Sequence, residues 1–401
     1  MKSILFLVEN YYPRMSGVPV VVQYLAEGLL EKGYDVSICT KWYEGLSDKE
    51  NINGIHVYRF RLRKTLMKRY VGEIDSYRKF VLSLNADVVI FECSECVTTD
   101  VLLRNLSQIK GKKIFHSHGF SGMRLLPFKW NVNLKYTLGN TYNWFRFKIY
   151  YSFTLKKYIK QFDETICLSE MDSSKVWLMK NAKKVNVLQN AVDAMFCETS
   201  KLISYPHIAK LNKPYLLCVC TYSKQKNQIG ILREYFKSGV EACLVFIGPE
   251  KTEYYYLLQK EINRLTIKYG KRDIQVLVKV PRIYIPNIMA NATLYLVGSN
   301  FEEYSISLVE TMAKGVPFIS TNVGNACILP GGVTVDSITD MHTKITFLWN
   351  NKEERMRLGK LGKQFVQENC RRHKAITLLE TIINSCLLYT SPSPRDRSVS
   401  R

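Results

Sequence analysis

Residues 300–317 combine two carboxylates with the start of a helix, a pattern that can bind phosphate and ribose. The segment reads NFEEYSISLVETMAKGVP, and Glu302 and Glu310 lie eight residues apart in it. Apolar residues at helical spacing begin at Ile306, and Gly315 ends the predicted helix. Glu302 would precede this helix, and Glu310 would lie in its first turn. The free N–H groups and the dipole at a helix N-terminus suit a phosphate, and a carboxylate one turn further in could accept hydrogen bonds from ribose hydroxyls.

A simpler interpretation of the same segment needs no ligand. Ser307 and Glu310 form an S-x-x-E pattern, the capping box, in which the glutamate only satisfies a backbone donor at the start of a helix. Glu302 would then be an ordinary loop acid. The segment by itself leaves both interpretations open.

The elements that must position these residues alternate between short apolar strands and amphipathic helices. This rhythm predicts an α/β protein with two parallel sheets wrapped by helices, separated by a polar stretch at 197–213. Strands of the first half are predicted at 4–8, 36–40, 88–91, 113–116, 165–168 and 185–188, with a helix at 18–30. Strands of the second half are predicted at 216–220, 243–247, 274–278, 294–297 and 318–320, with a helix from about 227 and a last helix at 375–384.

Length and composition agree with two folded domains. The chain has 401 residues, of which 46% are hydrophobic and 23% charged. Its first residues, MKSILFLVEN, predict a strand rather than a signal peptide, and no window approaches the roughly 20 apolar residues that cross a bilayer. The 11 cysteines are expected to be reduced, with a metal or redox role for the Cys93/Cys96 pair as the minor alternative. The net charge of +22 favours anionic partners.

Six motifs, in their order and spacing, resemble the retaining glycosyltransferases of family 4. The resemblance covers almost the whole chain and implies the GT-B architecture, in which two Rossmann-like βαβ domains face each other across a cleft. The segments that carry it are Tyr12-Pro13 with Gly17 and LAEGLLEKGYDV, HSHG at 116–119, QNAVDAMF at 189–196, SKQKN at 223–227, the E-x7-E pair at 302 and 310, and MAKGVPFISTNVGN at 312–325.

The resemblance assigns roles to single residues. Lys226 would bind the donor diphosphate, and Glu310 would bind the ribose. Glu302 would contact the transferred sugar near the reaction centre, and His118 would lie by that sugar from the other domain, so these two are the expected catalytic residues. The remaining members of the expected donor site are Gly17, Lys224, Ser305 and Ile306.

This set of residue types fits the departure of a nucleoside diphosphate. The leaving group gains negative charge as the glycosidic bond breaks, and a lysine and a helix N-terminus stabilise that charge. A metal is therefore not required, and the absence of a D-x-D motif agrees with metal-independent transfer. No cofactor is expected besides the nucleotide-sugar donor, which is a substrate.

The chain departs from the family pattern at several positions. Thr221 stands where the family has an arginine that shares the diphosphate, and we hypothesise that Lys224 supplies part of that charge. The family's E-G-F-G is EEYS at 302–305, its paired glycines are Ser16-Gly17, and its N-G-V-D is NAVD at 190–193. These changes leave two alternatives open: a non-catalytic nucleotide-sugar binding subunit, and a sugar-nucleotide epimerase of the same fold.

A basic and aromatic stretch in the first half favours a peripheral membrane surface near the acceptor site. Residues 101–160 contain twelve lysines and arginines and no acidic residue. The alternative is a solvated helix face over an aromatic core. Nucleic acid is not an expected partner, because charge alone supports it and no nucleic-acid motif is present. The basic residues are Arg104, Lys110, Lys112, Lys113, Arg124, Lys129, Lys135, Arg146, Lys148, Lys156, Lys157 and Lys160.

Taken together, these features predict a hexosyltransferase-type, retaining enzyme of polysaccharide or glycolipid biosynthesis. Its partners would be a nucleotide-diphosphate sugar, a glycan or lipid-linked acceptor, and an anionic membrane surface on the cytoplasmic side. The predicted domains are an N-terminal acceptor domain at 1–195, a nucleotide-sugar domain at 196–386 whose last helix could pack back on the first domain, and a disordered or non-native tail at 387–401. A dinucleotide-dependent oxidoreductase is not expected, since no G-x-G-x-x-G follows the first strand.

Overall fold

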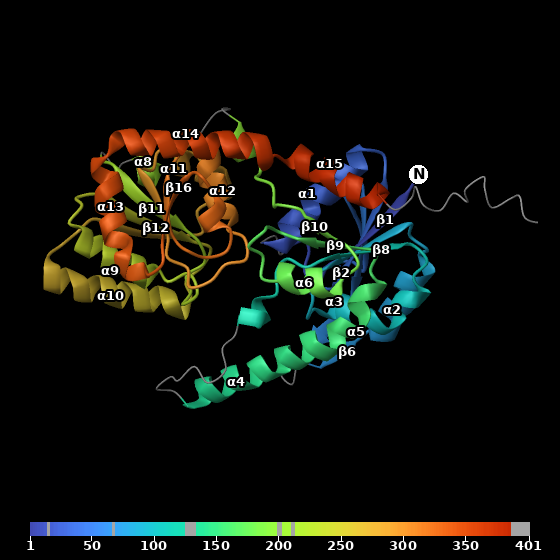
Figure 1. The fold of residues 1–401 in the computed structure, drawn as a ribbon. Coiled ribbons are helices and arrows are strands. Elements are labelled where there is room, and N and C mark those ends of the chain that lie inside the picture. Colours follow the sequence, from blue (N-terminus) through green and yellow to red (C-terminus); the bar gives the residue numbers. More distant parts are fainter. Residues whose placement is uncertain (14–16, 66–68, 125–133, 199–202, 210–212, 386–401) are drawn as a thin grey trace, which may run out of the picture. The chain divides into compact units, whose positions relative to one another are not determined.

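The chain folds into two compact α/β units. The computed structural model describes residues 1–13, 17–65, 69–124, 134–198, 203–209 and 213–385 (Figure 1). The N-terminal unit contains Met1–Gln189 and the segment that begins at His373, and the C-terminal unit contains Asn190–Arg372. Lys129, Ser16 and the tail at 387–401, named in the sequence-based expectations, lie outside the described residues.

An eight-stranded sheet forms the centre of the N-terminal unit. Its strand order is β10-β9-β8-β7-β1-β2-β4-β3, and every neighbouring pair is parallel except β3 with β4. The strands are β1 (Ser3–Leu7), β2 (Asp35–Lys41), β3 (Lys49–Ile52), β4 (Ile55–Phe60), β7 (Val88–Glu92), β8 (Lys112–His116), β9 (Glu164–Cys167) and β10 (Val185–Val187), with a separate hairpin of β5 (Leu62–Lys64) and β6 (Tyr70–Gly72).

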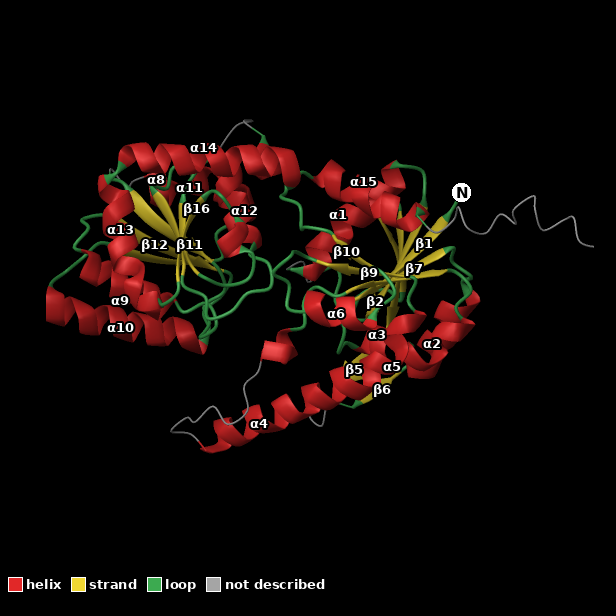
Figure 2. Ribbon diagram, viewed as in Figure 1, coloured by secondary structure: helices red, strands yellow, loops and turns green. Residues whose placement is uncertain are grey.

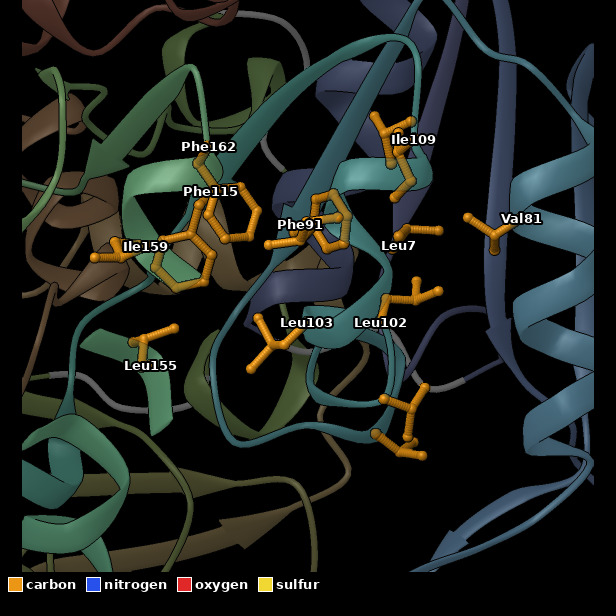
Figure 3. Close-up of a cluster of buried hydrophobic side chains, with 14 of the residues drawn as sticks. Leu7, Val81, Phe91, Leu102, Leu103, Ile109, Phe115, Leu155, Ile159 and Phe162 are labelled. Carbon is orange, nitrogen blue, oxygen red and sulfur yellow. The ribbon is translucent and has the colours of Figure 1, made fainter. Parts of the chain in front are cut away.

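Helices cover both faces of this sheet (Figure 2). The strands are therefore apolar on both sides, as β1 illustrates with its sequence SILFL. Figure 3 shows part of the resulting core, including Leu7, Phe91 and Phe115, none of which is exposed. The helices are α1 (Val18–Glu31), α2 (Ile74–Ser83), α3 (Val97–Asp100), η1 (Leu103–Gln108), η2 (Ser121–Arg124), α4 (Leu134–Ile149), the π-helix η3 (Tyr150–Leu155), α5 (Lys156–Tyr158), η4 (Ile159–Gln161), α6 (Lys175–Asn181) and α15 (Arg372–Asn384).

The C-terminal unit is built on a six-stranded parallel sheet with the order β13-β12-β11-β14-β15-β16. Its strands are β11 (Tyr215–Val219), β12 (Cys243–Gly248), β13 (Ile274–Val278), β14 (Leu294–Val297), β15 (Phe318–Thr321) and β16 (Gly332–Val335). Its helices are α7 (Ala194–Cys197), α8 (Pro206–Ala209), α9 (Gln228–Ser238), α10 (Glu253–Tyr269), η5 (Arg282–Tyr284), α11 (Ile285–Ala290), α12 (Ile306–Ala313), η6 (Ala326–Ile328), η7 (Ile338–Asp340), α13 (Met341–Asn350) and α14 (Lys352–Asn369).

In each unit the strand order reverses beside the first strand of its sheet, a feature that is associated with ligand binding in open α/β sheets. In open α/β sheets, ligands occupy the crevice outside the carboxyl ends of the strands where the order reverses. The reversal lies between β1 and β7 in the N-terminal unit and between β11 and β14 in the C-terminal unit. The loops that follow these strands are therefore the parts of the chain that can form a site.

Several elements were not predicted from the sequence. The strand β3 has the polar sequence KENI and is exposed along most of its length, as an edge strand can be. The strand β16 is only half-buried and begins with Gly332, so its apolar signal is weak. Within the described part of the chain, no helix is both long enough and apolar enough to span a bilayer.

Candidate active site

Lys226 stands at the end of a tight loop that joins β11 to α9. The loop closes on itself, since the backbone N–H of Lys226 donates to the carbonyl oxygen of Ser223 at 3.1 Å and to its Oγ at 3.2 Å. Asn227 then caps α9 in a left-handed conformation, and its side chain accepts from the Gly230 N–H at 3.1 Å. A side chain at Gly230 would collide with that cap, which lies 2.5 Å from an ideal Cβ. The local sequence therefore sets the position of Lys226 at the carboxyl end of the sheet.

The loop after β14 is joined to the Lys226 loop by three hydrogen bonds. The backbone N–H of Asn300 donates to the carbonyl oxygen of Gln225 at 2.7 Å, and its side-chain amide donates to that of Lys224 at 2.7 Å. The Gln225 amide donates in return to the carbonyl oxygen of Phe301 at 3.1 Å. Two segments more than 70 residues apart in the chain are thereby held side by side.

Lys226 and Glu302 meet where these two loops join. The ammonium of Lys226 pairs with Oε1 of Glu302, which also accepts from the Ser299 hydroxyl at 2.7 Å. Lys226, Ser299, Glu302 and Ser305 line the same pocket at the carboxyl ends of β11 and β14. The structure thus brings together three residues that the sequence assigned separately to a donor site.

Ser305 and Ile306 form the N-terminus of α12 beside that pocket. Ser305 is the N-cap residue and Ile306 is the first helical residue. The backbone N–H of Ser305 is bound by the side chain of Asn325 at 2.8 Å, which fixes the chain before the helix. The first backbone N–H groups of a helix have no partner within it, so this end can bind an anion.

Glu310 lies in the second turn of α12, so its predicted place in the first turn is wrong. The capping-box interpretation is wrong too, because Ser305 is the N-cap and Ser307 is the second helical residue. The Glu310 carboxylate is buried and accepts instead from the guanidinium of Arg282 at 2.6 Å. Burial raises the pKa of Glu310 above its ordinary value, while Arg282 opposes the rise.

His118 belongs to a buried cluster in the N-terminal unit. It follows β8 in a left-handed conformation, with φ at 51°. Its Nε2 lies 2.5 Å from Oε2 of Glu92, and Nδ1 of His116 lies 3.1 Å from the same oxygen. The centroids of the two imidazole rings lie 3.8 Å apart, and the ring planes are tilted by 35°. One carboxylate thus orients both rings at the carboxyl ends of β7 and β8.

The charges in this cluster follow from burial and proximity. Burial lowers the pKa of His118, and the neighbouring His116 lowers it further, so the ring is neutral at neutral pH. Burial alone would raise the pKa of Glu92, but the two imidazoles outweigh it and hold that pKa at about 2. Glu92 is therefore an anion that accepts a hydrogen bond from the neutral His118 ring.

Gly17 and Lys224, the two remaining residues of the expected donor site, lie in the loops that precede α1 and α9. Gly17 precedes α1 with φ at 65°, a conformation that favours glycine, and an added Cβ would meet no atom within 4 Å. It therefore leaves open space at the N-terminus of α1. Lys224 is exposed in the Lys226 loop, as is Thr221. The contribution of Lys224 to a diphosphate site stays a prediction.

Two family models match the sequence. The N-terminal match, described as glycosyltransferase family 4, covers residues 15–196. The C-terminal match, described as glycosyl transferases group 1, covers residues 203–365. The chain belongs to the family 4 glycosyltransferases. Among curated proteins, no sequence match was found.

Solved structures share the fold of this family 4 glycosyltransferase over nearly its full length. Sucrose-phosphate synthase from Thermosynechococcus elongatus is 14% identical, with a TM-score of 0.73 and coverage of 97% of this chain and 100% of the other. A glycosyltransferase from Rickettsia africae is 15% identical, with a TM-score of 0.71 and coverage of 97% and 99%. Anabaena HepE in complex with UDP and glucose is 15% identical, with a TM-score of 0.66 and coverage of 96% and 100%. These matches confirm the predicted GT-B fold with its two Rossmann-like units.

Two residues of this glycosyltransferase that contact predicted site residues were missed in the sequence. Glu92 is the last residue of an apolar strand, where a charged residue facing the carboxyl end was a usable signal. Arg282 follows β13 by four residues, and no local pattern connects it to Glu310, which lies 28 residues away. Both contacts arise only when separate strands and helices pack together.

The Glu92 cluster is the place where this glycosyltransferase could hold a metal. Ligating atoms of Glu92, His116 and His118 all lie within 4.8 Å of one another, a grouping not found elsewhere in the described part of the chain. Two ligands of one tetrahedral zinc ion, each about 2.1 Å from it, lie about 3.4 Å apart. The 2.5 Å between Glu92 Oε2 and His118 Nε2 is instead a hydrogen-bond distance. The distance between these two atoms therefore fits a hydrogen bond and not two ligands of one metal ion.

Proposed function

We propose that this family 4 glycosyltransferase transfers a hexosyl group, with retention, from a nucleotide-diphosphate sugar to a glycan or lipid-linked acceptor. The observation that carries the proposal is the pocket at the strand-order reversal of the C-terminal unit, lined by Lys226, Glu302 and Ser305. It joins a cation, a carboxylate and a helix N-terminus, which are the groups that a departing nucleoside diphosphate and a transferred sugar require.

Each residue has a role in the proposed transfer. Lys226 and the N-terminus of α12 at Ser305 and Ile306 bind the diphosphate and stabilise the charge that it gains as the bond to the sugar breaks. Lys226 leaves its ion pair with Glu302 when the diphosphate arrives, which frees the Glu302 carboxylate for the sugar. Glu310 accepts hydrogen bonds from the ribose hydroxyls. His118, held neutral by burial, contacts the sugar from the N-terminal unit.

Structural relatives support the choice of donors to test. Anabaena HepE was solved in complex with UDP and glucose, and a second structural relative, from E. coli, was solved with UDP-2-fluoro glucose. We infer that a UDP-sugar is the first donor to examine, followed by GDP- and ADP-sugars. A ligand that binds only the folded protein raises its apparent melting temperature, so a thermal-shift screen finds the donor without knowledge of the acceptor.

Removal of the Lys226 ammonium tests the donor site. Lys226→Ala should weaken binding of the nucleoside diphosphate by about ten-fold or more, because a hydrogen bond to a charged group contributes about 1.5–3 kcal/mol. The measurement is isothermal titration calorimetry. Lys237→Ala is the matched control, since Lys237 pairs with Glu234 in the same unit, away from the pocket. Equal affinities of the Lys226 and Lys237 variants would contradict the assignment.

The reaction itself is tested by product release. A transferase should release free nucleoside diphosphate in step with glycan extension when an acceptor extract is added. A non-catalytic subunit would bind the donor and never release product, and an epimerase would convert the sugar without any acceptor. Either of those outcomes would replace the proposed transfer by the corresponding alternative.

The surface of the N-terminal unit supports an acceptor at a membrane. An apolar stripe runs along α4 and η3. The helix α4 lies at the periphery of this unit (Figure 1). The members of the stripe recur every three or four residues and therefore share one helix face. They are Leu138, Tyr142, Phe145, Ile149 and Phe153, which are 62%, 59%, 59%, 43% and 71% exposed.

Basic residues accompany the apolar stripe. Lys148, Lys156, Lys157 and Lys160 are exposed, and the whole stretch 101–160 has no acidic residue to offset them. Apolar side chains beside cationic ones suit the surface of an anionic membrane. We therefore propose that the N-terminal unit docks on such a surface from the cytoplasmic side and acts there in glycolipid or polysaccharide synthesis. The side chains of Arg124 and Lys135 lie outside the described part of this region.

A further inference from the structure

Arg282 forms an ion pair with the buried Glu310 within the C-terminal unit. It begins η5, the short helix after β13, and its guanidinium donates to Oε1 of Glu310 on α12 at 2.6 Å. The Glu310 side chain is 6% exposed, whereas that of Arg282 is 52% exposed. The guanidinium also lies over the ring of Phe196, 5.2 Å from its centroid. Two different interactions thus hold one exposed arginine over one buried carboxylate.

This pair differs from two other arginine–glutamate pairs of the unit, whereas a third, Arg233 with Glu261, also joins two helices, α9 and α10. Arg264 with Glu261 and Arg357 with Glu354 join residues three apart on one helix, and such pairs contribute little to stability. The pair of Arg282 and Glu310 instead joins two elements. The other oxygen of Glu310, Oε2, has no hydrogen-bond partner among the described residues and is not fully buried. One carboxylate oxygen is anchored and the other is left for a ligand.

Without Arg282, the surroundings of Glu310 would favour its protonated, uncharged form. Burial raises its pKa, and the nearby Asp193 raises it further. Asp193 is itself paired with Arg372 at 3.1 Å, so Arg372 is not the counter-charge of Glu310. Arg282 is the group that lowers the pKa of Glu310 again, by its charge and by its hydrogen bond. A carboxylate that must accept hydrogen bonds near neutral pH therefore depends on Arg282.

We propose that Arg282 is a positioning residue for donor binding, which fixes the Glu310 carboxylate so that its free oxygen accepts the hydroxyls of the donor ribose. This proposal rests on the function proposed above and adds the residue that prepares the ribose site. Arg282 acts through Glu310 and need not touch the donor itself. Removal of Arg282 should therefore weaken the contact with the ribose of the donor, and not the contacts with the base or the diphosphate.

A cycle of protein and ligand changes tests this directly. Affinities of the wild type and of Arg282→Ala are measured by calorimetry for UDP and for 2′,3′-dideoxy-UDP, or for the GDP or ADP pair if the screen selects another base. Arg282→Ala should weaken UDP binding by about ten-fold or more and leave the weaker binding of the dideoxy analogue nearly unchanged. The coupling between the two changes isolates the ribose contact.

The pH dependence gives a second reading that a purely structural role would not produce. Without Arg282 the pKa of Glu310 rises, so the variant should lose more UDP affinity relative to the wild type at pH 6 than at pH 8. Arg282→Lys should restore part of the affinity and the wild-type pH dependence. Arg357→Ala, which breaks a helix-surface pair in the same unit, should change neither.

Failure of this proposal can be distinguished from failure of the proposed function. Equal losses for UDP and its dideoxy analogue would mean that Arg282 contacts the base or the diphosphate, and unchanged UDP affinity would mean that it has no role, so both overturn this proposal alone. No binding of UDP, GDP or ADP to the wild type would overturn the proposed function and this proposal with it. Wild-type thermal stability of Arg282→Ala is the check that a loss of affinity is not a loss of fold.

Discussion

Glu92 illustrates how one residue controls the chemistry of another. Its carboxylate is fully buried and lies within hydrogen-bond distance of two imidazole rings. His118 adopts a left-handed backbone conformation that most residues avoid, and the bond to Glu92 holds its ring in place there. A contact between His118 and the transferred sugar would therefore depend on a residue that the sugar does not touch.

Replacement of Glu92 tests that dependence. Glu92→Gln should lower turnover by about ten-fold or more while donor affinity stays unchanged, because an orienting bond to a charged group contributes about 1.5–3 kcal/mol. Turnover and donor affinity are measured separately, by product release and by calorimetry. Glu170→Gln is the control in the same unit, as its carboxylate is 66% exposed. Wild-type turnover of Glu92→Gln would exclude this role.

The same cluster predicts a pH dependence of stability. The folded-state pKa of His118 is lowered from 6.5, so the unfolded chain binds a proton before the folded one does. The contribution of the neutral His118 to the free energy of unfolding is then fully present above about pH 6.5, and it is lost as the pH falls below that value. Glu92→Gln should steepen this loss, since the carboxylate raises the pKa of His118. Urea unfolding at pH 7.5, 6.5 and 5.5 measures it, and equal slopes for the two proteins would contradict the explanation.

At the scale of elements, α4 and η3 carry the proposed contact with a membrane. Their C-terminal part is anchored to the unit, since Tyr150 and Tyr151 of η3 donate to Asp100 and Glu95 at 2.6 Å each. The apolar stripe lies on the face that these bonds leave exposed. An amphipathic helix fixed at one end can lie on a bilayer surface without any membrane-spanning segment.

Vesicle co-sedimentation separates the two contributions of this surface. Replacing Lys148, Lys156, Lys157 and Lys160 by Glu should abolish binding to vesicles with anionic lipid, because each basic residue near such a surface contributes about 1 kcal/mol. Replacing Tyr142, Phe145 and Ile149 by Ser should remove the part of the binding that resists added salt. The control replaces Lys260, Lys268, Lys271 and Lys344 by Glu, exposed lysines of the C-terminal unit, and should bind like the wild type.

One outcome would support the alternative interpretation, in which this stretch is a solvated basic face over an aromatic core. Wild-type protein that sediments equally with neutral and anionic vesicles, or with neither at low salt, would contradict the membrane proposal. Donor binding should survive all of these replacements, since Lys226, Ser305 and Glu310 of the proposed donor site lie in the other unit. A loss of donor affinity would mean that the variants are misfolded.

At the scale of the whole molecule, the chain leaves the N-terminal unit and returns to it. Its last described helix, α15, packs on α1, where an added Cβ at Gly28 would lie 2.1 Å from Ile376. The Lys112 ammonium binds the carbonyl oxygens at the end of α15, and Lys32 pairs with Glu380. The N-terminal unit is therefore completed by residues that follow the entire C-terminal unit in sequence.

A comparison of two adjacent leucines of α15 measures how much this helix contributes to the stability of the N-terminal unit. Leu379 is 1% exposed and Leu378 is 41% exposed. Leu379→Ala should destabilise the N-terminal unit by about 2–5 kcal/mol, as for buried leucines in general, and Leu378→Ala by about 0.5 kcal/mol or less. Chemical unfolding, with limited proteolysis to identify the unit that opens first, gives both values. Equal effects would mean that α15 does not contribute to the core.

Much of the fold could be predicted because its signals are local. Apolar runs such as those at β1, β7 and β14 mark strands buried on both faces, and Gly33 with φ at 86° follows the end of α1. The residues around Lys226 and Ser305 are local too, because a loop and a helix N-terminus position them. These parts of the proposed donor site follow from the order of residues in the chain.

Only the tertiary structure decided which distant residues meet. Glu92 reaches His118 from a neighbouring strand, Arg282 of η5 reaches Glu310 of α12, and α15 joins the unit that begins at Met1. The sequence by itself determined the two-unit α/β architecture and the family, whose motifs are short and contiguous. The partners of its buried charges were decided by packing, since a charge can be buried only where the fold brings a counter-charge to it.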